Sequence, residues 1–281
     1  MSNMVVRTNV FALNAHRNMR NVGLEQGRAA ARLSSGYRIN SAADDAAGLG
    51  ISESMRAQIR GLDQASRNAQ DGQALIQTAE GGMQEMQNML QRARELTVQA
   101  ANDTNTTVNR ESIRAEVQQL SQEFTSMANR VQFNGMDLLT ASGPDEFFFQ
   151  VGANANQGVT LDAAAIHTAI AGVAGIFSGI GASLGADAGA ISGNIAVFQT
   201  QIDAISTQRG LLGAAQNRMD FTIRSLEISS ENLSDAESRI RNTDMAREMM
   251  RFTMSNVLQQ ASVSMLAQAN QLPNNLLSLL R

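Results

Sequence analysis

Apolar residues recur at alternating steps of three and four along much of the chain, a spacing that predicts long helices packed on one another. The clearest run starts at Leu62 and meets apolar or small side chains as far as Ala100. Larger residues occupy one row of this run and small residues the other, as expected of a coiled-coil-like helix with one closely packed edge. Beyond the polar stretch 102–109, the same stagger from Ile113 to Val131 predicts a second helix.

The longest apolar frame lies in the C-terminal half and runs from Ile191 to Leu272. Pro273 is expected to close this helical segment, because proline lacks the backbone N–H that a helix needs. A shorter stripe near the N-terminus predicts that the two chain ends pair in a bundle. Three charged residues interrupt the long frame and mark an expected joint between two packing environments: Asp244, Arg247 and Arg251.

The middle of the chain carries turn and strand signals instead of heptads. An Asn-Gly pair lies within residues 132–140, and a Phe-rich run starts at Glu146, so a small β-hairpin is expected here. The glycines that follow, as far as Gly193, predict a low-complexity connector. The predicted fold is therefore mainly α, with coiled-coil-like helices from both chain ends forming a rod and a small β-hairpin in the middle.

Composition narrows the possible chemistry. The chain has 281 residues with 22 basic and 26 acidic side chains, and a net charge of −4 argues against binding nucleic acid through a general basic field. All the basic residues are arginines and there is no cysteine, which excludes lysine chemistry, thiolate nucleophiles, disulfides and cysteine-ligated metal centres. We therefore expect no enzyme activity and no cofactor.

Two features with a possible chemical meaning have simpler interpretations. Ser183 lies in a GxSxG sequence typical of a hydrolase nucleophile, but no histidine follows it in the chain, so the match is attributed to chance. The adjacent pair Asp44 and Asp45 could bind a cation, yet helix capping is the favoured interpretation.

Metal binding and a membrane span are also not expected. His16 and His167 have no companions at ligand spacing, and the methionines at 83, 86 and 89 have the spacing of core residues. Residues 163–186 lack charge but are mostly Ala and Gly without a basic flank, which disfavours a membrane span. The N-terminus does not read as a cleavable signal peptide. Residues 252–280 carry no charge but eight Asn or Gln side chains, which is typical of a surface that meets another protein.

Several motifs resemble those of bacterial flagellins, the subunits of the flagellar filament. They occur in the family's order and cover most of the chain outside residues 155–190: Ser34–Ser52, Gln70–Asn102, Phe149–Asn154, Leu212–Asp220 and Ser264–Arg281. The resemblance implies an inner-tube domain, D0, from residues 1–44 and 241–281. It implies an outer-tube domain, D1, from residues 45–145 and 191–240, with the hairpin and a short variable region at 146–190 between its halves.

The resemblance also implies how the chain is exported and assembled. Such subunits are exported unfolded, with an export chaperone, through the flagellum's own secretion apparatus, and they polymerise beneath a filament cap on hook–filament junction proteins. The absence of cysteine suits this route, because a disulfide would block an extended chain. The protein is thus expected to be secreted into an extracellular flagellum, with a periplasmic flagellum as the alternative.

Three sets of residues follow from the stripe pattern together with the resemblance. The residues expected to pack the inner tube are Val6, Val10, Leu13, Leu258, Met265 and Leu272. The residues expected at the joint between the tubes are Asp44, Asp45 and Asp244. The positions that match the motif recognised by the animal innate receptor Toll-like receptor 5, or that tune subunit packing instead, are Gln91, Arg92, Leu96 and Glu116.

Three alternatives stay open at this point. A hook–filament junction protein shares the N-terminal motif but generally lacks the flagellin terminus found here at residues 269–281. A coiled-coil scaffold would explain the heptads but not the ordered motifs. An ordinary intramolecular bundle of the chain ends would use the same apolar stripes as a polymer.

Overall fold

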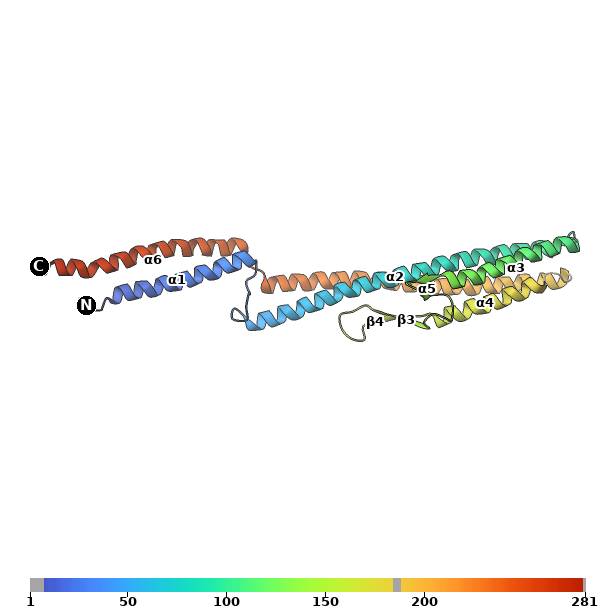
Figure 1. Ribbon diagram of the computed structural model, residues 1–281, viewed down its shortest axis with the longest axis horizontal. Helices are drawn as coiled ribbons and strands as arrows, with labels where there is room; N and C mark the ends of the chain where they lie inside the picture. Colours follow the sequence, from blue (N-terminus) through green and yellow to red (C-terminus); the bar gives the residue numbers. More distant parts are fainter. Residues whose placement is uncertain (1–7, 184–187, 280–281) are drawn as a thin grey trace. The chain divides into compact units, whose positions relative to one another are not determined.

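A computed structural model describes residues 8–183 and 188–279, with side chains described at 8–180 and 191–271. The described residues are predominantly helical (Figure 1). The helices are α1 (Val10–Ser35), α2 (Ala46–Ala100), α3 (Thr107–Arg130), α4 (Ala164–Ser183), α5 (Ala188–Arg241) and α6 (Met245–Leu279). The predicted class, mainly α with long helices and a small β-hairpin, is confirmed.

The chain divides into two compact units. We call residues 1–57 with 232–281 the terminal unit, and residues 58–231 the central unit. No helix among the described residues combines the length and the apolar character that crossing a membrane requires.

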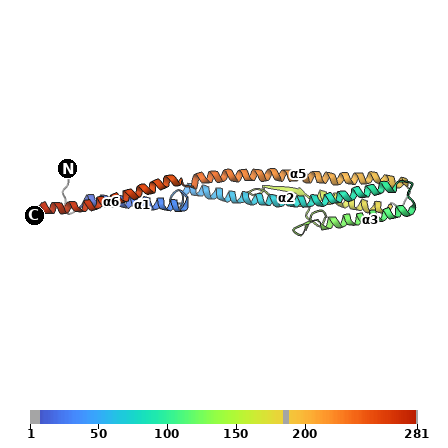
Figure 2. The same cartoon turned by 90° about the horizontal axis from the view of Figure 1, so that it is seen from above.

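The central unit is a helical bundle built on α2 and α5, which run side by side in opposite directions (Figures 1 and 2). The seam predicted from Leu62 to Ala100 is the buried face of α2, and Met83, Met86 and Leu90 have no exposed surface. Helix α3 supplies the apolar positions predicted from Ile113 onward. The methionines at 83 and 86 are therefore core residues, as the spacing predicted.

Helix α4 corrects the prediction of a connector after the hairpin. Its apolar residues recur at steps of four and three, so they share one face, and that face is buried in the core of the central unit. The glycines at 172, 175 and 179 lie where an added Cβ would meet nothing within 4 Å, so they face open space. Packing outweighs the low helix propensity of glycine here. The buried residues of α4 include Ile166, Ile170, Val173, Phe177 and Ile180.

Two small antiparallel sheets lie between α3 and α4 in the sequence, where the turn and strand signals predicted one small hairpin. Strands β1 (Gln132–Phe133) and β2 (Met136–Asp137) flank Asn134 and Gly135. These two turn residues have positive φ values of 52° and 76°, as a tight Asn-Gly hairpin turn requires. Strands β3 (Glu146–Gln150) and β4 (Gly158–Asp162) form the larger hairpin.

In the terminal unit α1 and α6 lie side by side in opposite directions (Figure 1). Helix α5 ends at Arg241 and α6 begins at Met245, so the helical segment is interrupted at the predicted joint. The prediction for Pro273 is wrong, because α6 remains helical to Leu279. Proline removes a single backbone hydrogen bond, and the Ala269 carbonyl that loses it accepts one from Asn9 instead.

Candidate assembly surface

Helix α6 packs on α1 mainly with small and polar side chains. Its buried and half-buried positions recur at steps of four and three, as in a coiled-coil seam, yet only two of them are large and apolar. Polar contacts with α1 confirm which way this face points: Gln26 Nε2 donates to Asn256 Oδ1, and Arg32 Nη1 lies 3.6 Å from Glu248 Oε1. The seam residues at this spacing are Glu248, Phe252, Ser255, Gln259, Ser262, Leu266 and Ala269, and half-buried Asn256 lies beside Ser255.

Most large apolar side chains of the two terminal helices point away from this seam. They are between 44% and 68% exposed, and in α6 they surround the outer side of the helix. The outward residues of α1 are Val10, Phe11, Leu13 and Leu24. The outward residues of α6 are Met245, Met249, Met250, Met254, Val257, Leu258, Val263 and Met265. We call this combined set the outer apolar face.

Four of the six residues predicted to pack the inner tube lie on the outer apolar face, namely Val10, Leu13, Leu258 and Met265. Val6 and the side chain of Leu272 lie outside the described residues. The intramolecular pairing of α1 with α6 therefore does not bury the predicted stripe, against the expectation that a bundle of the chain ends would use it. Contiguous exposed apolar surface of this kind marks a site of protein association.

Two of the three aspartates predicted at the joint, Asp45 and Asp244, cap helices, whereas Asp44 binds the loop before α2. Asp45 Oδ1 accepts the Gly48 N–H at 2.9 Å at the start of α2, and Asp244 Oδ1 accepts the Arg247 N–H at 3.1 Å at the start of α6. Oδ2 of Asp44 accepts hydrogen bonds from the backbone N–H groups of residues 41 and 40, which lower the pKa of this carboxyl. Asp45 is therefore the helix cap that the favoured interpretation of this pair predicted, and Asp44 is not one.

Backbone pairing ties the two chain segments of the joint together. Tyr37 and Asn242 form an isolated antiparallel bridge, and the Thr243 N–H donates to the Gly36 carbonyl at 3.0 Å. The Arg241 guanidinium lies 4.7 Å from the centre of the Tyr37 ring, within cation–π range. Sequence reasoning named the aspartates but missed Tyr37 and Arg241, although Tyr37 is the chain's single tyrosine and lies within the Ser34–Ser52 motif.

Comparison with known proteins identifies the family of this chain through two family models. The chain matches the "Bacterial flagellin N-terminal helical region" over residues 6–143 and the "Bacterial flagellin C-terminal helical region" over residues 195–280. The chain belongs to the bacterial flagellin family. It is therefore a structural subunit of a flagellar filament, extracellular or periplasmic, in which copies of the flagellin polymerise.

Similar flagellins span the whole chain. The flagellin of Halalkalibacterium halodurans is 50% identical over 99% of this chain and 100% of its own length. The Bacillus subtilis flagellin is 43% identical with the same coverage. The flagellar filament 33 kDa core protein of Treponema phagedenis is 41% identical, again over 99% of this chain and its full length.

The residues matching the receptor motif divide between the surface and the core of this flagellin. Gln91, Arg92 and Glu116 are exposed, and Arg92 Nη2 lies 2.9 Å from Glu116 Oε1, which joins α2 to α3. This hydrogen-bonded carboxylate raises the pKa of the Arg92 guanidinium. Leu96 is only 2% exposed and belongs to the core cluster. It can support this surface from below but cannot itself touch a partner in this conformation.

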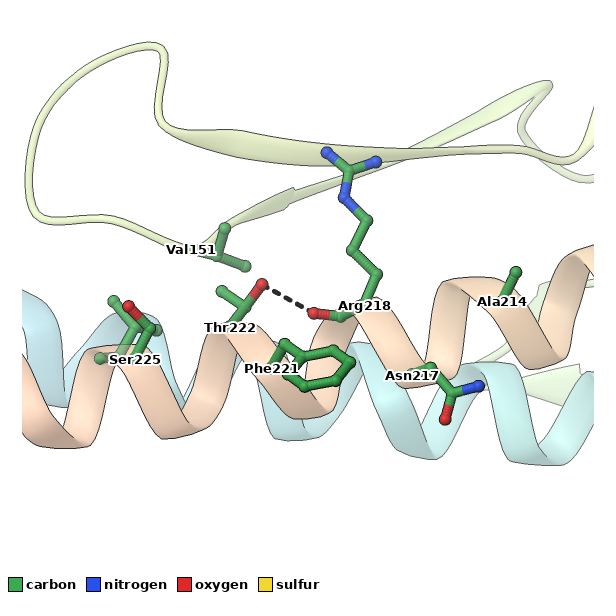
Figure 3. A pocket seen from close by; sticks show the side chains of 8 residues that line it. Val151, Ala214, Asn217, Arg218, Phe221, Thr222 and Ser225 are labelled. Atoms are coloured by element: carbon green, nitrogen blue, oxygen red, sulfur yellow. Dashed lines mark hydrogen bonds between the residues drawn. The ribbon is translucent and has the colours of Figure 1, made fainter.

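A groove lies on α5 beside Val151 (Figure 3). Val151 approaches α5 from the hairpin side, and the Thr222 hydroxyl donates to the Arg218 carbonyl at 2.8 Å, as exposed helical threonines do. Arg218 is the single titratable residue among its lining residues, which are Val151, Ala214, Asn217, Arg218, Phe221, Thr222, Ser225 and Leu226.

The two histidines lie in different surroundings. His16 is exposed on α1, whereas His167 is buried in α4 with Nε2 3.2 Å from the Leu138 carbonyl oxygen. Across residues 8–183 and 188–279, no group of three or more acidic or histidine side chains is placed to hold a metal ion. The side chain of Ser183 lies outside the described residues.

Proposed function

We propose that α1 and α6 build the inner tube of the filament by packing the outer apolar face against neighbouring copies. The observation that carries this proposal is the inverted burial in the terminal pair: α6 contacts α1 mainly with small and polar residues, and most of the large apolar residues face outward. A helix pair with such a surface gains stability when other copies cover it. Contacts between different patches on successive copies give an open helical polymer.

We propose further that the inner-tube domain comprises residues 1–44 and 241–281 and the outer-tube domain residues 45–145 and 191–240. The segment 146–190 then belongs between the halves of the outer domain. Support for these limits comes from the helix caps at Asp45 and Asp244, which begin α2 and α6. A cap fixes where a helix starts, so Asp45 and Asp244 set the joint between the tubes, and Asp44 holds the loop that precedes α2.

The proposed assembly route follows from the family. The chain passes unfolded through the flagellar secretion apparatus with an export chaperone and adds beneath the filament cap, above the hook–filament junction proteins. A chain without cysteine cannot form a disulfide that would obstruct this passage.

The test of the proposed function is assembly of purified chains after heat-monomerisation and a salt jump, viewed by negative-stain electron microscopy. We expect the full chain to form long filaments and a chain ending at Arg251 to remain soluble, because the truncation removes most of the outer apolar face of α6. Filaments from the truncated chain would contradict the proposal. Soluble particles from both chains would favour a junction protein or a scaffold.

We also propose that the monomer is a ligand of Toll-like receptor 5 through Gln91, Arg92 and Glu116. The paired and exposed Arg92 and Glu116 support this, because planar, preorganised guanidinium groups are frequent anchors at interfaces. We expect Arg92→Ala to lower potency in a receptor reporter cell about tenfold or more. The control is Arg130→Ala, which removes another exposed ion pair of α3, with Glu123. Equal potency of the two variants, or no response to the unaltered monomer at saturating dose, would refute the receptor proposal.

A further inference from the structure

The proline inside α6 leaves one backbone acceptor without its helical donor. In an α-helix each carbonyl accepts the N–H four residues further on. For the Ala269 carbonyl that residue is Pro273, which has no N–H, although α6 continues to Leu279. Ala269 is 7% exposed, so water has little access to this residue. A buried acceptor without a donor destabilises the folded state.

Asn9 supplies the missing donor from the other chain end. Its Nδ2 donates to the Ala269 carbonyl oxygen at 2.7 Å, across 260 positions of sequence. Its Oδ1 accepts the Ala12 N–H at 3.0 Å and so caps the start of α1. One side-chain amide therefore serves both helices. Aspartate could cap α1 but has no N–H to donate, and serine is too short to reach α6 while capping.

We infer that Asn9 is a positioning residue that fixes the register of α1 against α6 by binding the single carbonyl that Pro273 leaves free. Only Phe252 and Leu266 are large and apolar among the seam residues of α6, so few side chains can specify the register by shape. A slip of one residue would turn the outer apolar face by about 100° around the helix axis. This inference rests on the proposed function, because it concerns how the outer apolar face is presented to neighbouring copies.

A double-mutant cycle on the full-length chain tests this role, with the critical concentration for filament growth as the readout. Asn9→Ser keeps an N-cap but removes the donor. Pro273→Ala gives the Ala269 carbonyl a backbone donor of its own. We expect Asn9→Ser to raise the critical concentration about tenfold beside Pro273, and only about twofold in the Pro273→Ala background.

Asn9→Asp separates this role from simple capping. Aspartate is as good an N-cap as asparagine and interacts favourably with the helix dipole, so a capping role alone predicts an unchanged or lower critical concentration. Binding of the Ala269 carbonyl predicts the opposite, because a carboxylate oxygen would replace the amide nitrogen beside another oxygen. We expect Asn9→Asp to raise the critical concentration at least as much as Asn9→Ser, and Pro273→Ala to reduce that penalty.

Two results would overturn the inference: equal Asn9→Ser penalties in both backgrounds, or an Asn9→Asp variant that grows filaments as readily as the unaltered chain. Failure of the proposed function has a different signature. In that case the unaltered chain would form no filaments, or the chain ending at Arg251 would form them, whatever residue stands at position 9.

Discussion

Leu258→Arg is expected to abolish filament growth while leaving the single chain folded. Leu258 lies on the outer apolar face and is 44% exposed, so an arginine there can reach water in the monomer and changes its stability by less than about 1 kcal/mol. In the filament the same face is proposed to meet other copies. A buried charge without a partner costs several kcal/mol, and the cost recurs at every subunit that is added.

Helix α6 offers the introduced charge no acidic partner after Glu248. Beyond Glu248 the chain contains no acidic residue, and Arg251 is the one charged residue between positions 249 and 280. Filament growth is measured by electron microscopy and sedimentation, and helicity of the monomer by circular dichroism. The matched control is Leu258→Met, which keeps an apolar side chain of similar size and should grow filaments. Normal filaments from Leu258→Arg would contradict the proposal that the outer apolar face packs in the inner tube.

Much of the helical framework could be predicted because packing and periodicity agree there. The seam from Leu62 to Ala100 is buried in a single chain, so a heptad pattern identifies both the helix and its inner face. The joint at Asp244 could be predicted because charged residues interrupt the regular spacing of apolar residues there. The turn at Asn134 and Gly135 was visible because few other pairs tolerate positive φ at both positions.

The features that sequence reasoning missed carry weak or misleading local signals. The glycines of α4 suggested a connector, although Ile166, Ile170 and Val173 follow a helical spacing that could have revealed the helix. The inner seam of α6 contains Ser255 and Ala269, which give no hydrophobic pattern to follow. The proline rule failed at Pro273 because the donor that compensates for it, Asn9, is distant in sequence.

Phe177→Ala is expected to destabilise the central unit by about 3–5 kcal/mol, the usual cost of removing a fully buried phenyl ring. Phe177 has no exposed surface. Its ring meets Phe124 of α3 edge to face at 5.8 Å between ring centres, and Phe198 of α5 at 5.4 Å. Truncation therefore leaves a cavity where three helices meet and also removes both aromatic contacts. Urea unfolding of the monomer, with hydrogen exchange of the α4 amides, measures the loss.

The same substitution at Phe221 is the matched control. Phe221 is 66% exposed on α5, with the Arg224 guanidinium 4.7 Å from its ring centre, so Phe221→Ala should cost about 1 kcal/mol or less. The comparison decides whether α4 is part of the core or an attachment to it. Equal, small effects of the two substitutions would mean that α4 can detach without unfolding α3 and α5. A large loss at Phe177 alone means that α4 is an integral part of the core that it shares with α3 and α5.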